Sequence, residues 1–328
     1  MTPPAALTRR RGLRRRLVVT VAALLATAGV LTAATGSAQA GETAAAPRQY
    51  PVGDLGTAVS NFFASPNAVA GANDWNCKPS ATHPDPVVLV HATFVNQGAN
   101  WAQIAPTLAN EGHCVFAFNY GMNPVLSLGR IGGMTGVAGS ARTMSAFVDK
   151  VLAKTGAKKV DLVGHSQGGM MPNYYIKRLG GAAKVDKFVA MAPSNHGTTL
   201  NGLVNLGEAI HVLGLVNGFF DLMGLQGLKD QEAGSDFQKA LWADGDTAPG
   251  VRYAVIQTKN DKVVTPYTNA FLKGGNAENI LLQDQCPENP VGHVGLAFDG
   301  PTVQNVVNEL GADVPGFQPK CEKYGIGF

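Results

Sequence analysis

The stretch VDLVGHSQGGM at residues 160–170 decides the fold class of this chain. Residues 160–163 are typical of a short buried strand, and residues 168–179 of the helix that follows it. Between them the letters GHSQG match the G-x-S-x-G pattern, in which a serine occupies a sharp strand-to-helix turn. Glycines two residues before and after the serine leave room for strand and helix to approach closely. The motif in this setting predicts Ser166 as a nucleophile.

Outward from this stretch, short apolar runs alternate with helical patterns. Further strands are expected at residues 87–90, 114–119, 187–191, 252–257 and 279–282. Apolar residues also recur at helical spacing between Met144 and Leu152, and we expect Ser140 to cap that helix. Short apolar strands separated by helices predict a mainly parallel sheet with helices on both faces. The fold class is therefore α/β.

A serine hydroxyl becomes an effective nucleophile when a base removes its proton. In folds with this strand-to-helix serine, the acid and then the histidine follow the serine along the chain. Asp261 comes just after the strand at 252–257, and His293 lies in a loop after the next strand. Loops at the carboxyl ends of parallel strands meet at one edge of the sheet. Ser166, Asp261 and His293 are therefore the predicted catalytic residues.

The other histidines fit the role of base less well. His165 adjoins the serine, but the turn itself holds it away from a productive approach. His91 and His196 follow strands, and we expect them to line the pocket. The remaining histidines have no supporting sequence context and are more often surface or packing residues.

The developing negative charge on a substrate carbonyl also needs hydrogen-bond donors. One donor is expected to be the backbone N–H of Gln167, which follows the nucleophile. The loop after the strand at 87–90 should supply the second, and we expect it to be the backbone N–H of Thr93, with Phe94 as the alternative. An ordinary strand-to-helix turn is the other interpretation of that loop.

The N-terminal residues have the order of a secretory signal peptide: six arginines, an apolar run at 17–31, and an A-x-A sequence ending at Ala40. We expect residues 1–40 to be removed on export, with an uncleaved anchor as the alternative. They hold six of the 26 Lys and Arg and none of the 23 Asp and Glu, so the remaining 288 residues carry a net charge of −3. The apparent basicity belongs to the export signal, and no nucleic-acid partner is expected.

The mature chain is expected to have an irregular or weakly helical lead-in at residues 41–85 and a catalytic domain at 86–328. Its four cysteines suggest two disulfides outside the cell, with three possible pairings. We favour Cys77 with Cys114 and Cys286 with Cys321, because each pair closes a loop of moderate length. No C-x-x-C pair occurs, and neither a metal site nor a cofactor is expected.

Two other segments allow more than one interpretation. Residues 203–228 are strongly apolar, and they fit either a cap over the active site that can meet a lipid surface or a pair of core helices. The glycines between Gly129 and Gly139 lack the G-K-[ST] sequence of a phosphate-binding loop, so we expect a mobile loop there.

Taken together, these sequences resemble the class 2 triacylglycerol lipase family of secreted bacterial enzymes, whose fold is that of the α/β-hydrolases. The matching pieces are VVLVHATF (87–94), VDLVGHSQGGMMPNYY (160–175), APSNHGTT (192–199), TKNDKVVTPY (258–267) and GHVGL (292–296). The resemblance implies the same triad and the same two oxyanion donors, fatty-acid esters as substrates, and no cofactor. One departure is Ala92, where the family usually has glycine.

The sequence therefore predicts a secreted serine hydrolase that cleaves carboxylic esters and acts as a monomer. Its expected partner is a small-molecule or lipid ester, with transient contact at a lipid interface. Acyl transfer to an alcohol and cleavage of a polyester remain alternatives, because the same triad performs both reactions. A non-catalytic binding protein of this fold is the alternative from another class.

Overall fold

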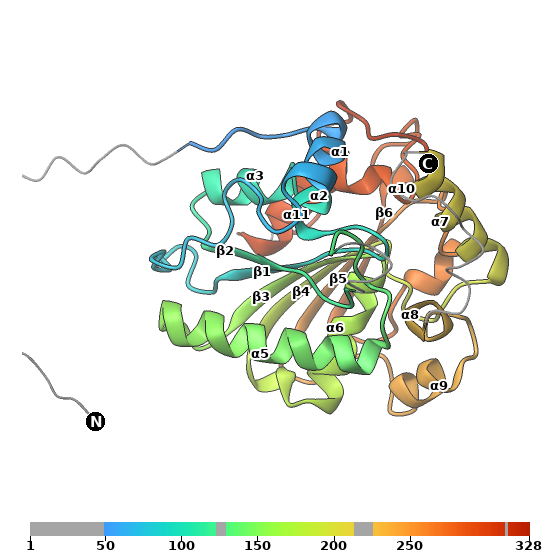
Figure 1. Cartoon of the computed structure of the whole chain (residues 1–328), viewed down its shortest axis with the longest axis horizontal. Coiled ribbons are helices and arrows are strands. Elements are labelled where there is room, and N and C mark those ends of the chain that lie inside the picture. The colour runs from blue at the N-terminus through green and yellow to red at the C-terminus, as the bar shows by residue number, and fades with distance from the viewer. Residues whose placement is uncertain (1–48, 123–128, 213–225, 312–313) are drawn as a thin grey trace, which may run out of the picture. The chain divides into compact units, whose positions relative to one another are not determined.

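Six short parallel strands form the central sheet in the computed structural model of this chain (Figure 1). Their order is β2-β1-β3-β4-β5-β6, and every neighbouring pair is parallel. The strands are β1 (Val87–Val90), β2 (Val115–Phe118), β3 (Val160–His165), β4 (Val185–Met191), β5 (Arg252–Gln257) and β6 (Ala277–Leu281). β1, β2 and β3 are buried at every position, which is typical of a sheet covered on both faces. The expected α/β class and parallel sheet are confirmed.

The structure describes residues 49–122, 129–212, 226–311 and 314–328. All of them belong to one unit, Pro47–Phe328. The expected export signal at residues 1–40 lies outside the described residues, as does the stretch 213–225 of the apolar segment. In the part of the chain that is described, no helix has the length and apolarity needed to cross a membrane.

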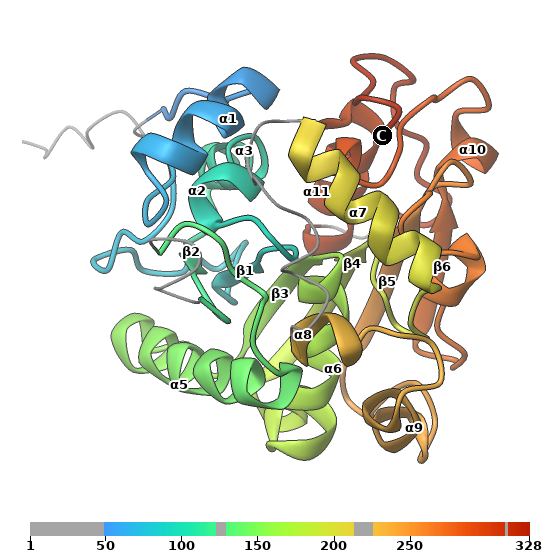
Figure 2. The same cartoon turned by 45° about the vertical axis from the view of Figure 1, so that its right-hand side comes forward.

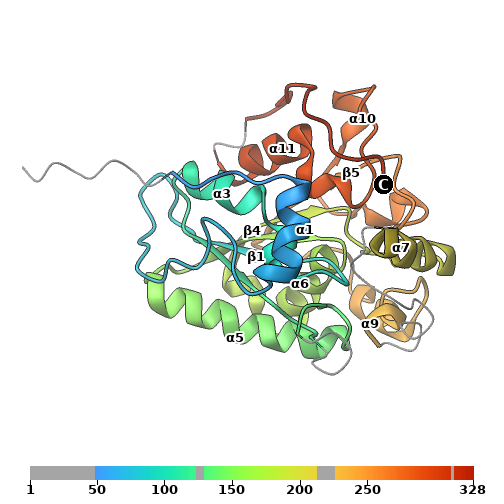
Figure 3. The same ribbon diagram turned by 45° about the horizontal axis from the view of Figure 1, so that its top comes forward.

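Helices cover both faces of the sheet (Figures 1 and 3). On one face lie α5 (Val137–Thr155) and α6 (Gln167–Arg178), and on the other lie α3 (Ile104–Asn110) and α11 (Gly300–Leu310). Each face has its own apolar core, one centred on residues such as Phe116, Met144 and Tyr175, and the other on Trp101, Leu108 and Val306. These two cores hold the strands rigidly, so that the loops at the strand ends can be positioned accurately.

Shorter elements surround the ends of the strands. Figure 2 shows α7 (Leu200–Val212), α8 (Gln226–Lys229) and α9 (Asp236–Trp242) on the side where the strands end. The remaining helices are α1 (Leu55–Ala64), α2 (Gln97–Asn100) and α10 (Leu282–Gln285), together with single 3-10 turns at Gly181–Ala183, Tyr267–Ala270 and Gly295–Phe298.

The prediction that Ser140 caps a helix is wrong. The helix α5 begins at Val137, with Gly136 at the N-cap position, and Ser140 lies buried inside its first turn. The backbone N–H of Val137 donates instead to Oδ2 of Asp230, at 2.8 Å. A carboxylate 93 residues away therefore caps this helix, and local sequence carries no signal of such a partner.

The favoured disulfide pairing is confirmed. Cys77 is bonded to Cys114, and Cys286 to Cys321. The first bond ties the lead-in to the residue before β2. Within the lead-in, α1 buries Ala58 and Phe62, and Phe62 packs against Phe94 in a third apolar cluster.

Candidate active site

The turn after β3 places Ser166 at the beginning of α6 in a strained backbone conformation. Its φ of 57° and ψ of −119° are rare for a residue with a side chain. The backbone N–H of Ser166 donates to Met191 O at 2.9 Å, which holds the turn against β4. The flanking glycines are required: a Cβ on Gly164 would lie 2.0 Å from Gly168 O, and one on Gly168 would lie 2.1 Å from Val90 O.

The structure brings Ser166, His293 and Asp261 together in one hydrogen-bonded chain. Nε2 of His293 lies 2.9 Å from Ser166 Oγ, and Nδ1 of the same ring lies 2.9 Å from Asp261 Oδ2. All three residues are buried. Two of the loops follow β3 and β5, and the third follows the short helix α10 at the end of β6, which explains why residues so distant in sequence meet here.

Asp261 is oriented by its own loop. Its Oδ1 accepts hydrogen bonds from the backbone N–H groups of Val263, at 2.8 Å, and Val264, at 2.9 Å. This leaves Oδ2 to face the imidazole. Because Oδ2 can only accept, His293 must carry its proton on Nδ1, and Nε2 is then free to accept the serine proton.

The backbone N–H groups of Thr93 and Gln167 fit the role of oxyanion donors. Among the described residues, neither N–H is paired with a protein acceptor. The N–H of Phe94, the alternative donor, is already engaged, because it donates to Gly132 O at 2.9 Å. Thr93 is therefore the better candidate for the second donor.

Side chains behind the oxyanion loop hold it in place. Gln231 donates from Nε2 to Thr93 Oγ1 at 3.1 Å, and Asn100 accepts at Oδ1 from the backbone N–H of Ala92 at 3.0 Å. Gln167 donates its own side-chain amide to Gly133 O, at 3.0 Å. The sequence carried no signal for Gln231, which acts from a distant element, or for Asn100, whose contact with Ala92 depends on how α2 folds back on the loop.

The glycine-rich stretch is part of this support. Residues 131–134 are buried, and Gly133 donates its N–H to Tyr120 O at 3.0 Å. A Cβ on Gly133 would lie 2.9 Å from the Cα of Thr93. The expectation of a mobile loop is therefore wrong for these residues, because their glycines allow close packing beneath Thr93. Residues 123–128 lie outside the described residues.

The histidines near the site differ from expectation. His91 is stacked on Tyr120 beneath the oxyanion loop, with ring centroids 4.3 Å apart, and burial lowers its pKa to about 4. His196 lies 3.2 Å from Asp246 through its Nε2. Neither lines the cavity next to His293, whereas His165 does.

His165 links two parts of the site. Its Nε2 lies 3.0 Å from the carbonyl oxygen of His293, and its Nδ1 lies 3.2 Å from Oδ1 of Asn100. Burial, reinforced by the neighbouring His293, lowers the pKa of His165 to about 3. The His293 carbonyl and Asn100 Oδ1 can both only accept, and a neutral ring donates from one nitrogen, so His165 donates to one of these two oxygens.

A small apolar cavity of about 50 Å³ adjoins Thr93 and His293. Besides the oxyanion loop and α2, its walls include Leu55, Ala58 and Val59 from α1, Leu206 from α7, and the turn that carries Val294, Ala297 and Phe298. The contribution of α1 was missed at the sequence level, because the lead-in showed only a weak helical pattern.

The described part of the apolar segment lies over the site. In α7, Leu203 and Leu206 are buried in the third apolar cluster with Phe94 and Val263. The helix is also tied to the loop after Asp261, because Asn205 donates to Lys262 O at 2.7 Å. These contacts fit both interpretations of the segment, a cap and a core helix, and the cap stays a prediction.

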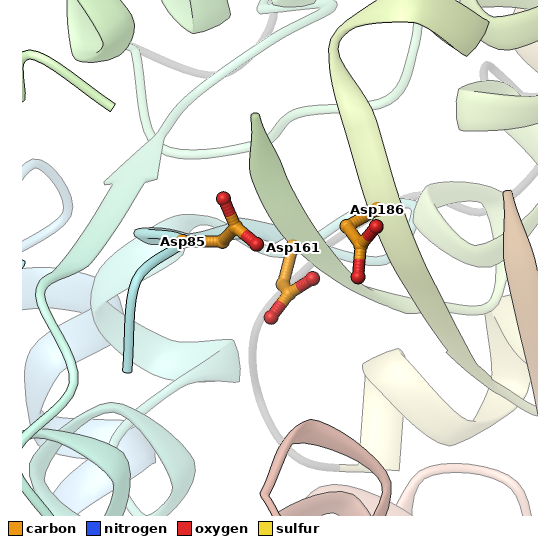
Figure 4. Close-up of side chains that lie close together, drawn as sticks. All are labelled: Asp85, Asp161 and Asp186. Atoms are coloured by element: carbon orange, nitrogen blue, oxygen red, sulfur yellow. The ribbon is translucent and has the colours of Figure 1, made fainter. Parts of the chain in front are cut away.

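Three acidic side chains gather away from Ser166, where the strands begin (Figure 4). The side-chain oxygens of Asp85, Asp161 and Asp186 lie within 4.8 Å of one another. Lys159 pairs with Asp186 at 3.2 Å, and the backbone N–H of Lys187 donates to Asp161 at 3.0 Å. Burial raises the pKa of Asp161 to about 7. This cluster takes no part in the arrangement around Ser166.

The fold and this arrangement define the chain as an α/β-hydrolase. Its residues 84–285, more than half of the chain, match the family described as lipase (class 2). The chain belongs to the class 2 lipase family, and the predicted family is confirmed.

Curated relatives and solved structures agree with this family. The chain is 35% identical over 124 residues to a triacylglycerol lipase of Burkholderia plantarii, and 36% identical over 94 residues to one of Pseudarthrobacter phenanthrenivorans. These matches cover 36% and 27% of this chain, and 31% and 27% of the relatives. The crystal structure of Aspergillus fumigatus lipase B shares the fold, with a TM-score of 0.59 and 19% identity, over 77% of this chain and 57% of that one. The matched family and relatives support the prediction of a carboxylic ester hydrolase.

Proposed function

We propose that this chain is a secreted serine hydrolase that cleaves carboxylic esters of fatty acids through an acyl-enzyme intermediate. The observation that carries the proposal is the hydrogen-bonded chain from Ser166 through His293 to Asp261, with both contacts at 2.9 Å. A carboxylate, an imidazole and a hydroxyl in this order are the parts of a nucleophile activated by a general base.

In the first half of the reaction, Ser166 Oγ attacks the ester carbonyl carbon while His293 Nε2 takes the hydroxyl proton. The imidazolium that forms keeps its Nδ1–H on Asp261, whose negative charge stabilises it. The carbonyl oxygen becomes an oxyanion and accepts hydrogen bonds from the backbone N–H groups of Thr93 and Gln167. His293 then returns its proton to the leaving alcohol, and the acyl group stays on Ser166.

In the second half, His293 removes a proton from water, and the resulting hydroxide attacks the acyl carbonyl. The same two N–H groups stabilise the second oxyanion. When this intermediate collapses, Ser166 regains its proton from His293 and the carboxylic acid leaves. One ester and one water become one acid and one alcohol.

The surroundings of the triad support an apolar acyl group. The cavity next to Thr93 and His293 has almost entirely apolar walls, so transfer of an alkyl chain from water into it is favourable. The two disulfides suit an oxidising compartment, and we propose export directed by residues 1–40.

The test compares hydrolysis of a short soluble ester with hydrolysis of an emulsified long-chain triacylglycerol, using Ser166→Ala as the matched control. We expect activity on both substrates, lost in the variant, and covalent labelling of Ser166 by a fluorophosphonate. Activity on the short ester alone would assign the chain as an esterase. A folded wild-type protein that neither labels nor hydrolyses would contradict the proposal.

A further inference from the structure

Residues 323–328, which we call the strap, run along the loop that carries His293. Three backbone N–H groups of that loop donate to strap carbonyls: Gly292 to Ile326 O at 2.9 Å, and Val294 and Gly295 to Phe328 O at 2.7 and 3.2 Å. Both chain neighbours of His293 are thus hydrogen-bonded to the strap. In Figure 1 the chain end marked C lies on the side of the sheet that carries α10 and α11.

Glycines on both sides make this contact possible. A Cβ on Gly292 would lie 2.5 Å from the carbonyl carbon of Phe328, and one on Gly295 would lie 2.1 Å from Ile326 O. In the strap, a Cβ on Gly325 would lie 2.3 Å from Gly295 O. The glycines of the GHVGL sequence therefore provide space for the strap, and they have no contact with Ser166 that would explain them.

The strap is anchored at its beginning. Cys321, two residues before it, is bonded to Cys286, and Lys323 O accepts a hydrogen bond from Gly300 N–H at 2.8 Å. Gly325 N–H donates to Oδ1 of Asp299 at 3.0 Å. Asp299 is fully buried and caps α11. It also accepts a hydrogen bond from Asn289, which lies three residues before Gly292.

The outer part of the strap contributes little to the core. Ile326 and Phe328 are 37% and 36% exposed, and Gly327 is exposed as well. Ile326 and Phe328 belong to none of the buried apolar clusters, so their loss should lower the global free energy of unfolding by less than the loss of a core residue. Their loss does leave three N–H groups beside His293 without their acceptors. The expected effect is therefore local, a displacement of the His293 loop.

We propose that the strap is a positioning element that holds the His293 loop in register, so that Nε2 stays within hydrogen-bonding distance of Ser166. The expected effect on catalysis rests on the proposed function, whereas the contacts of the strap are independent of it. A displacement of about 1 Å in a catalytic group can lower turnover by about a hundredfold, so a loosened loop need not unfold to lose activity.

Two variants test the proposal in the full-length protein: deletion of residues 325–328, and Gly325→Ala, whose new Cβ meets Gly295 O. Gly275→Ala is the matched control, because a Cβ there has no heavy atom within 4 Å. The measurements are kcat and KM on a short soluble ester, the active fraction from fluorophosphonate titration, and hydrogen exchange of the amides at 292, 294 and 295.

For both strap variants we expect kcat per active site to fall about tenfold or more, since the base is displaced, with a smaller change in KM because Val294 of the same loop lines the cavity. Exchange of the three loop amides should accelerate, while exchange of the β3 and β4 amides stays slow. Gly275→Ala should match the wild type in every measurement. If the deletion variant fails to fold, Gly325→Ala alone decides.

Faster exchange of the loop amides with unchanged kcat would overturn the proposal, as would unchanged exchange in the variants. So would a loss of activity explained entirely by a smaller active fraction. If the wild type itself has no esterase activity, the proposed function fails, and the exchange measurement still shows whether the strap orders the loop.

Discussion

Ser166 is held in a backbone conformation that costs a residue with a side chain about 1–3 kcal/mol. The surrounding structure holds Ser166 in that conformation. Gly164 and Gly168 allow strand and helix to approach closely, and Met191 O accepts a hydrogen bond from the Ser166 N–H. The result is a hydroxyl directed at His293 and a following residue whose N–H points toward the site of reaction. Strain at this residue is thus part of the positioning.

At Asp261, the substitution Asp261→Asn tests the direction of the hydrogen bonds. An asparagine can keep its oxygen on the N–H groups of Val263 and Val264, so its NH₂ then faces His293 Nδ1. Nδ1 must become the acceptor, and the ring proton moves to Nε2, where it can no longer accept from Ser166. We expect kcat to fall by about 10⁴-fold with the melting temperature little changed. Retention of more than a tenth of the activity would contradict this role.

At His165, the substitution His165→Phe tests the link between the oxyanion loop and the base. Phenylalanine keeps an aromatic ring and removes both nitrogen contacts, to the His293 carbonyl and to Asn100 Oδ1. We expect kcat to fall about tenfold, because the His293 loop loses a contact that positions the base. KM should change as well, because His165 lines the cavity.

Because the pKa of His165 is lowered to about 3, its ring is neutral from pH 5 to 9, and the loss caused by His165→Phe should be the same throughout that range. Steady-state kinetics at several pH values provide the check. A loss that grows toward low pH would instead mean that His165 carries a charge in the wild type.

At the scale of the elements, α1 and α7 together decide the size of the acyl cavity. Leu206 of α7 lines it opposite the α1 side chains, and Leu203 is buried on the same helix but does not line it. We expect Leu206→Ala to enlarge the cavity and raise kcat/KM for an octanoate ester relative to a butyrate ester. Both Leu→Ala changes should cost about 2–5 kcal/mol of stability.

Leu203→Ala is the matched control, since it removes the same atoms from the same helix. The measurement is the ratio of kcat/KM for the two esters in each variant. If both variants changed the ratio equally, the effect would come from a loosened α7 and would not depend on the cavity wall.

At the scale of the whole molecule, buried histidines should make the fold sensitive to acid. Burial lowers the pKa of His91 and His113 to about 4 and that of His165 to about 3, against an ordinary value of 6.5. Below pH 6.5 the unfolded chain takes up protons that the folded chain excludes. Their stabilising contribution is therefore fully present above pH 6.5 and declines as the pH falls toward 4.

Asp161 acts in the opposite direction. Its pKa is raised by burial from 3.8 to about 7, so between these values the unfolded chain releases a proton that the folded chain retains. Its contribution therefore falls as the pH rises. The three histidines together change the free energy of unfolding more than the one aspartate does. We therefore expect the free energy of unfolding to rise between pH 4.5 and 6.5.

The substitution Asp161→Asn isolates this second effect. It should stabilise the protein by roughly 2–4 kcal/mol at pH 8 and by almost nothing at pH 4, because the carboxyl is already neutral there. Urea unfolding at both values measures it, with Glu288→Gln on the exposed surface as the control. Equal stabilisation at both pH values would mean that the charge of Asp161 is not the cause.

Much of the fold could be predicted because its signals are local. Short apolar runs bounded by glycine and polar residues predicted all six strands. The signal is clearest in β1 and β2, since a strand buried on both faces needs apolar residues at every position. The turn at Ser166 was equally visible, because close approach of strand and helix demands glycine at fixed positions. The helix start at Val137 was not, since Asp230 caps it from a distant loop.

The sequence by itself determined the α/β class, the class 2 lipase family and which serine, aspartate and histidine to test, because fixed backbone geometry imposes residue types at fixed spacings. Only the tertiary structure decided what surrounds them: Asn100 and Gln231 behind the oxyanion loop, α1 in the cavity wall, and the strap along the His293 loop. Apart from the contact of Asn100, these contacts join segments far apart in the chain, and their free energy arises only when the folded backbone brings the partners together.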